Sequence, residues 1–117
     1  MSGRRVEVLV FDGCPNVEIA LERARAAMAT THTDAEVRVV VVSSDEDARR
    51  LRFLGSPSVH VDGVDVDPSA PTRADFGLHC RLYAIGGRME GAPPVDWIAL
   101  ALRGASATGE PFGEPLR

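Results

Sequence analysis

The run VRVVVV, residues 37–42, restricts the fold more than any other part of this chain. Its only polar residue is Arg38, so it lacks the alternation of apolar and polar residues that marks a strand with one face in water. Such a strand is typical of a parallel sheet that helices cover on both faces. The run therefore predicts an α/β domain, in which the crossover into this strand is right-handed.

The other elements follow from similar patterns. β-branched runs that end at turn residues predict strands, and apolar residues at helical spacing after a Pro or a capping residue predict helices. We expect strands at residues 5–11, 37–42, 58–61 and 80–85, and helices at about 15–30, after Ser44, and after Pro93. The expected order is β-α-β-α-β-β-α, with a four-stranded mixed sheet and helices on both of its faces.

The length of 117 residues fits one domain, which we place at residues 1–104. Residues 105–117 are rich in Gly, Pro and Ser and are expected to form a flexible C-terminal tail. The polar stretch 65–79 is long for a loop in a domain of this size, which makes it a candidate cover for a functional site.

Composition excludes several classes of function. All 13 basic residues are Arg, which rules out chemistry that needs a Lys, such as a Schiff base or the phosphate contact of a P-loop. These Arg residues are scattered and the net charge is −4, so no nucleic-acid partner is expected. We find no apolar run of membrane-spanning length and no N-terminal leader, and we therefore expect a cytoplasmic protein without a membrane partner.

Cys14 lies at the junction between the first expected strand and the first expected helix. Unpaired backbone N–H groups and the positive end of the helix macrodipole stabilise a thiolate at such a position. Pro15 removes one of these donors, whereas Asn16 and Val17 keep theirs. Asp12 either opposes ionisation of the thiol or relays a proton. We interpret Cys14 as a reactive thiol, the alternative being a small buried cysteine at a strand end.

Two motifs connect this cysteine to a known fold. FDGCPNV, residues 11–17, and GSPSVHVDG, residues 55–63, resemble the cysteine-bearing helix start and the cis-proline loop of thioredoxin-like proteins. The resemblance implies a thioredoxin-like fold in which Pro57, preceded by Ser56, is the cis-proline beside Cys14. Together with GLHCRLY and GAPPVDWIALAL, these motifs resemble a small bacterial group of thioredoxin-like proteins labelled alkylmercury-lyase-like, over residues 6–102. That label implies handling of organomercury.

The chain departs from thioredoxin at the second cysteine of the C-x-x-C motif, because Val17 holds that position. A local dithiol cycle is therefore excluded. Either Cys14 acts alone and an outside thiol releases it, or Cys80 is its resolving partner. A simple hairpin register places Cys80 at the end of the sheet opposite the cis-proline loop, too far away for a disulfide, whereas the loop before Cys80 would allow a return towards Cys14.

The histidines and the acidic cluster carry weaker signals. His60 alternates with two valines and is interpreted as a solvent-facing strand residue. Asp65 and Asp67 are interpreted as turn residues, since the other ligand positions of a calcium loop are missing. His79 adjoins Cys80, but the spacing matches no standard zinc motif. Neither a metal nor another cofactor is expected.

Three functions remain open. The first is a thiol redox protein, an oxidoreductase with Cys14 as nucleophile and Cys80 as second thiol, acting on a thiol, a disulfide or a small electrophile. Its expected substrate-binding residues are Asp12, Pro15, Asn16, Ser56 and Pro57. The second is a thiol binder of organomercury or another soft metal. The third is a thioredoxin fold that binds proteins without turnover, which the missing cysteine at residue 17 keeps open.

Overall fold

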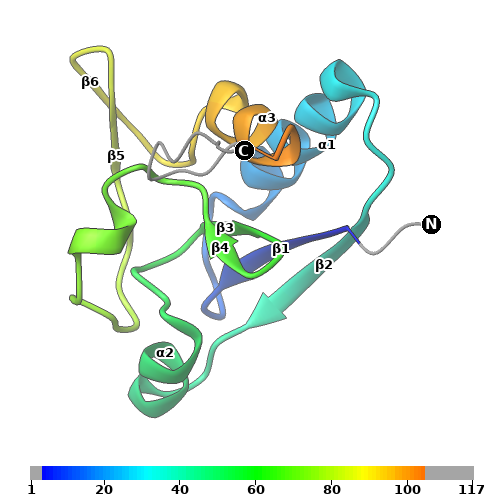
Figure 1. Cartoon of the computed structure of the whole chain (residues 1–117). Coiled ribbons are helices and arrows are strands. Elements are labelled where there is room, and N and C mark those ends of the chain that lie inside the picture. The colour runs from blue at the N-terminus through cyan, green and yellow to red at the C-terminus, as the bar shows by residue number, and fades with distance from the viewer. Residues whose placement is uncertain (1–3, 105–117) are drawn as a thin grey trace.

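A four-stranded mixed sheet in the order β2-β1-β3-β4 lies at the centre of the computed structural model, which describes residues 4–104 (Figure 1). Its strands are β1 (Arg5–Val10), β2 (Glu36–Val41), β3 (Ser58–Val61) and β4 (Val64–Asp65). β1 runs parallel to β2 and antiparallel to β3. Asp62 and Gly63, both with positive φ, form the two-residue turn from β3 into the antiparallel β4.

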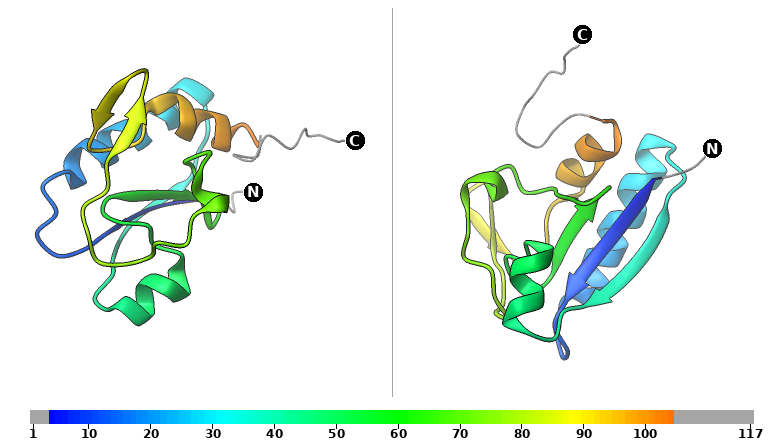
Figure 2. Two further views of the ribbon diagram at one scale, coloured as in Figure 1. Left: turned by 90° about the vertical axis from the view of Figure 1, so that its left-hand side faces the viewer. Right: turned by 60° about the horizontal axis from the view of Figure 1, so that its bottom comes forward.

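Three α-helices and a separate hairpin complete the fold. The helices are α1 (Val17–Thr31), α2 (Asp45–Leu51) and α3 (Val95–Leu102), with a short 3-10 helix η1 (Ala70–Thr72). β5 (Tyr83–Ile85) and β6 (Arg88–Glu90) pair only with each other in the described part of the chain. α1 and α3 pack side by side, as both views of Figure 2 show.

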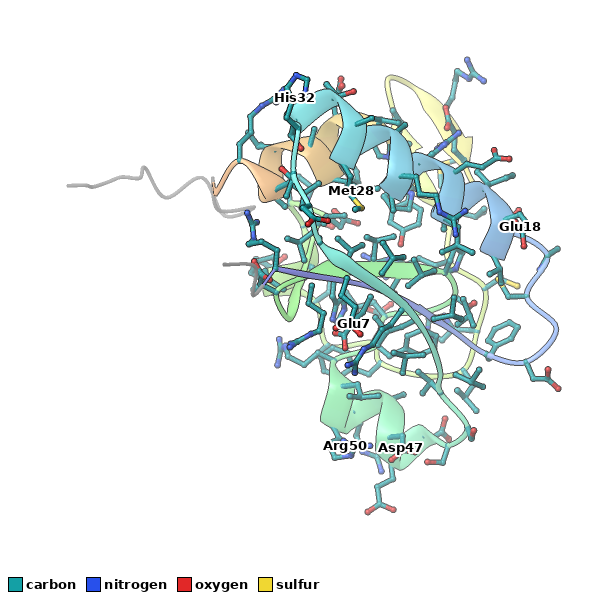
Figure 3. All side chains as sticks on the ribbon, turned by 90° about the vertical axis from the view of Figure 1, so that its right-hand side faces the viewer. Glu7, Glu18, Met28, His32, Asp47 and Arg50 are labelled. Carbon is teal, nitrogen blue, oxygen red and sulfur yellow. The ribbon has the colours of Figure 1, made fainter. Side chains whose placement is uncertain are left out.

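Local signals account for the helix boundaries. The Ser44 side chain accepts a hydrogen bond from the Asp47 backbone N–H at 3.1 Å, which confirms the predicted N-cap of α2. Asp47 also forms an exposed ion pair with Arg50, and Figure 3 shows both side chains on the outer side of α2. α1 begins at Val17, two residues later than predicted, with Asn16 as its N-cap.

The prediction of a fourth sheet strand at residues 80–85 is wrong. The tight turn after β3 brings Val64 directly back along β3, so β4 fills that place in the sheet. Only Tyr83–Ile85 of the predicted strand is extended and paired, and its partner is β6. Cys80 instead makes an isolated parallel bridge to Ser56.

Alternate residues of β1 belong to two apolar clusters. Val6, Val8 and Val10 pack with buried residues of α1 and α3. Leu9 packs with Ala48 of α2 in a second cluster, which also contains Phe53 and Val42. Fully burying a side chain of this size contributes about 1.5–3 kcal/mol to stability. Because β1 provides buried side chains to both clusters, it connects them across the sheet.

β2 is an edge strand, and the prediction that both of its faces are covered is wrong. Val39 is 47% exposed and Val41 57% exposed. β2 has β1 on one side only. Val39 and Val41 pair with Val8 and Val10, so they lie on the face that α1 covers, but α1 packs over β1 and leaves the edge strand open. The apolar run thus reflects the preference of β-branched residues for strands rather than burial.

Among residues 4–104, no helix combines the length and the apolar character that crossing a bilayer requires. The expectation of a flexible tail at residues 105–117 falls outside the described residues.

Candidate functional site

Cys14 lies in the loop between β1 and α1, beyond the carboxyl end of β1. Its backbone N–H donates a hydrogen bond to the Phe11 carbonyl at 3.3 Å, which closes a turn through Asp12 and Gly13. The thiol is free and half-buried, and it packs against the larger apolar cluster. Because Asn16 is the N-cap, Cys14 lies two residues before the helix cap rather than within the first turn.

Ser56 joins the two cysteine-bearing segments. Its buried Oγ accepts a hydrogen bond from the Phe11 backbone N–H at 3.2 Å. Its own N–H donates to the His79 carbonyl at 2.9 Å, and its carbonyl accepts from the Arg81 N–H at 3.0 Å. The Ser56–Pro57 peptide bond is cis, as expected. Ser56 therefore lies between the turn before Cys14 and the segment that carries Cys80.

Cys80 lies at the same end of the sheet as the Ser56–Pro57 bond, because the two residues form a parallel bridge. The register that placed it at the opposite end is therefore wrong. The loop returns Cys80 to Ser56, and its pairing with Cys14 stays a prediction. In the left view of Figure 2, the β1–α1 loop and the segment before β5 lie at one end of the sheet. The Cys80 thiol is free and exposed.

The backbone of Ser56 is already fully used. Both its N–H and its carbonyl are bonded to the 79–81 segment, so they are unavailable to an added peptide strand. Ser56 and Pro57 are themselves buried. Among the expected substrate-binding residues, these two therefore support the site, and their side chains do not meet solvent.

Asp12, Pro15 and Asn16 occupy three different positions around Cys14. Asp12 and Pro15 are exposed, and Asp12 lines a cavity described below. The half-buried Asn16 side chain lies against Gly91, where an added Cβ would be 2.5 Å from its Nδ2. A side chain at residue 91 would therefore displace the Asn16 side chain from this position.

A cavity of about 400 Å³ opens between the carboxyl ends of β1 and β2. It is lined by Phe11, Asp12, Val41, Val42, Ser43 and Leu78. Ligands of open α/β sheets bind outside the carboxyl ends of parallel strands. Here the lining residues include those that shortly precede each cysteine, Asp12 before Cys14 and Leu78 before Cys80, so the cavity adjoins both thiol-bearing segments.

A buried ionic network follows Cys80 directly, and it was missed at the sequence level. The Arg81 side chain is 1% exposed and donates to Asp65 Oδ2 at 2.7 Å, to Asp67 Oδ2 at 3.1 Å and to Ser58 Oγ at 2.8 Å. The interpretation of Asp65 and Asp67 as simple turn residues is therefore incomplete. Asp65 ends β4 and Asp67 follows two residues later, and both carboxylates reach Arg81. This D-V-D spacing was the available signal.

Charge and burial set the ionisation of the network. Burial favours the neutral acid of Asp65, but contacts with His60 and Arg81 outweigh burial, and the pKa of Asp65 lies below its usual value. Burial raises the pKa of Tyr83, whose ring lies 4.6 Å from the Arg81 guanidinium and whose hydroxyl donates to the Pro57 carbonyl. The network therefore holds Pro57 and Ser58, the two residues after Ser56, against the segment that begins at Arg81.

His60 is buried, and the prediction of a solvent-facing residue is wrong. β3 is a central strand, so its residues meet packed neighbours on both faces. Val59 and Val61 belong to the larger apolar cluster, and His60 points to the other face, where Asp65 Oδ2 lies 3.7 Å from its Nε2.

The chemistry available beside Ser56 is that of two thiols. Within residues 4–104, no three side chains of His, Cys, Asp or Glu gather closely enough to hold a metal ion. No family model, no curated protein and no solved structure matches the chain at a significant level. The function is therefore inferred from the site itself.

Proposed function

We propose that the chain is a thiol redox protein with a thioredoxin-like fold, in which Cys14 is the nucleophile and Cys80 the resolving thiol. The observation that carries this proposal is Ser56, which is hydrogen-bonded to the turn before Cys14 and to both neighbours of Cys80. The strand order β2-β1-β3-β4 supports the thioredoxin-like arrangement. The two clusters on alternate residues of β1 support helices on both faces of the sheet.

The proposed reaction is thiol–disulfide exchange in two steps. The Cys14 thiolate attacks one sulfur of a substrate disulfide, forms a mixed disulfide and releases the other half of the substrate as a thiolate. The Cys80 thiolate then attacks the Cys14 sulfur, which forms the Cys14–Cys80 disulfide and releases the second substrate thiolate. The substrate gains two electrons and the two cysteines lose them. An outside thiol pair reduces the internal disulfide and completes the cycle.

The second step requires the Cα atoms of Cys14 and Cys80 to come within about 4.4–6.8 Å of each other. Ser56 lies between Cys80 and Phe11, which precedes Cys14 by three residues. The turn from Phe11 to Cys14 therefore has to carry the thiol past Ser56 to the 79–81 segment. Gly13 in this loop has no neighbouring atom within 4 Å of an added Cβ, so the turn is not packed at that point.

The occupied backbone of Ser56 favours a small substrate over an extended peptide. A peptide cannot pair with Ser56 unless the 79–81 segment leaves it. The cavity beside the site offers apolar contacts from Phe11, Val42 and Leu78, and the carboxylate of Asp12 disfavours a negatively charged ligand there. We therefore infer a small, largely apolar disulfide or electrophile as the substrate.

Mass measurement after mild oxidation tests this function. The chain has two cysteines, so each single variant leaves one thiol. We expect the wild type to become lighter by two hydrogen atoms, and Cys80→Ser to accumulate mixed disulfides on Cys14. Cys14→Ser is the matched control and should react more slowly with a small disulfide than Cys80→Ser does. The redox proposal would be refuted if both variants reacted with the small disulfide at the same rate and if the unfolded chain reacted at that rate too.

Binding of mercury or another soft metal is the second candidate, favoured by the two free thiols on either side of Ser56. This function predicts an adduct of one mercury per chain, whose formation depends on Cys14. A wild-type-like adduct in Cys14→Ser would exclude it. If neither oxidation nor mercury depends on Cys14, the remaining function is protein binding without turnover.

A further inference from the structure

A second cavity, of about 300 Å³, lies between the chain that follows α2, the β3–β4 hairpin and η1. It is lined by His60 and Asp65 in the interior, by Arg52 and Phe76 on one wall, and by Leu54 and Pro71 on the others. It shares no lining residue with the cavity beside Cys14. η1 and Phe76 belong to the stretch 65–79 that the sequence marks as a cover. We call this space the His60 cavity.

The interior of the His60 cavity holds an imidazole with unused hydrogen-bonding capacity. The His60 side chain is 5% exposed, and its Nε2 finds no hydrogen-bond partner in the described part of the chain. Asp65 Oδ2, at 3.7 Å, is too far for a good hydrogen bond and is already bonded to Arg81. Buried polar groups without a partner are uncommon in native proteins, and a bound water, ion or ligand is a common explanation for them.

Arg52 and Phe76 form a flat, positively charged wall. The Arg52 guanidinium lies over the Phe76 ring, 5.1 Å from its centroid, and among residues 4–104 it is paired with no carboxylate. A stacked guanidinium keeps its planar fork of N–H donors, which matches the two oxygens of a carboxylate. The other walls, from Leu54 and Pro71, are apolar.

We propose that the His60 cavity binds a small aromatic carboxylate of one ring. The ring packs between Phe76 and the apolar walls, the carboxylate pairs with Arg52, and a polar ring substituent bonds to His60. The size agrees, because an apolar cavity of about 150 Å³ already holds benzene, and about 300 Å³ leaves room for the carboxylate and one substituent. This site is independent of the proposed redox function.

Titration with three probes, followed by NMR chemical shifts, tests the proposal on the full chain. The probes are 4-hydroxybenzoate, benzoate and the neutral benzamide. We expect saturable binding of both carboxylates with shifts confined to residues of the His60 cavity. Because a charged hydrogen bond is worth about ten- to hundredfold in affinity, benzamide should bind at least about tenfold more weakly than benzoate. The hydroxyl should make 4-hydroxybenzoate the tightest of the three.

Matched variants separate this site from the general charge of the protein. Arg52→Gln should weaken benzoate about tenfold or more and leave benzamide unchanged. Arg50→Gln, in the exposed ion pair with Asp47, removes the same charge two residues away and should have no effect. A Cys14→Ser/Cys80→Ser variant should bind as the wild type does. Absence of saturable benzoate binding, equal affinity for benzamide, or equal loss in the Arg52 and Arg50 variants would overturn the proposal.

Discussion

Replacement of Arg81 by Met tests the energetic role of the buried ionic network. The substitution keeps most of the side-chain volume but removes the guanidinium that Asp65 and Asp67 share. The Arg81 side chain is 1% exposed and the two carboxylates are 9% and 10% exposed, so both would remain buried without their partner. Breaking a buried ion pair in this way costs about 3–5 kcal/mol. That is a large share of the 5–15 kcal/mol that stabilises a typical domain, about a fifth or more.

Urea denaturation followed by the fluorescence of Trp97 measures this loss. At a slope of about 2 kcal/mol per M, the midpoint should fall by roughly 2 M. Arg50→Met is the control, because Arg50 also pairs with an aspartate but is 65% exposed. An exposed pair at this helical spacing is worth about 0.3–0.5 kcal/mol, so this variant should be almost as stable as the wild type.

The pH dependence gives a second, independent readout. The folded pKa of Asp65 is lowered, so the stability that this carboxylate contributes is present above its unfolded pKa of about 3.9 and is lost as the pH falls through the folded value. The difference between wild type and Arg81→Met should therefore be largest near neutral pH and shrink in acid. A cost for Arg81→Met no larger than that of Arg50→Met, or a difference that does not change between neutral pH and acid, would refute the reasoning.

Three further outcomes are expected. The chain has one Tyr, so phenolate absorbance reports Tyr83 alone. Burial raises the pKa of Tyr83, so the phenolate signal should appear above pH ~10 together with loss of stability. Ordinary titration of the folded protein near pH ~10 would contradict the burial. Ser44→Ala should lower the free energy of unfolding by about 1 kcal/mol and Ser43→Ala by much less, because Ser44 caps α2 and Ser43 does not. Equal losses in the two variants would count against the cap. Phe53→Ala should cost about 3–5 kcal/mol, since Phe53 is fully buried, and a cost below about 2 would show that the cluster collapses around it.

Features that depend on neighbouring residues could be predicted from the sequence. The bounds of β3, the Ser44 cap and the turn at Asp62 and Gly63 are confirmed, because each is fixed by a few adjacent residues. A four-stranded mixed sheet was also expected and is present, but its fourth strand is β4 rather than residues 80–85. Its membership in the thioredoxin-like fold stays a prediction.

Features that depend on the return of a long segment could not be predicted. The position of Cys80 beside Ser56 and the burial of Arg81 are both set by the path of residues 66–79, for which the sequence offers no periodic pattern. His60 was misjudged for the same reason, because the segment that covers its face of β3 was not known. The exposure of Val41 shows a different limit: an apolar run predicts a strand but not whether it lies in the centre or at the edge of a sheet.

The Arg81 network also determines how this part of the protein opens locally. Its partners lie 14, 16 and 23 residues from Arg81 along the chain, so the contacts that neutralise it all fall within residues 58–81. Loss of either carboxylate contact leaves a buried Asp without its cationic partner, so we expect the whole region to open in one step. In native-state hydrogen exchange, the protected amides of this region should share one opening free energy, distinct from that of β1 and α1. Cys80 belongs to that cooperative unit and Cys14 does not, so the two cysteine-bearing segments would open in separate fluctuations.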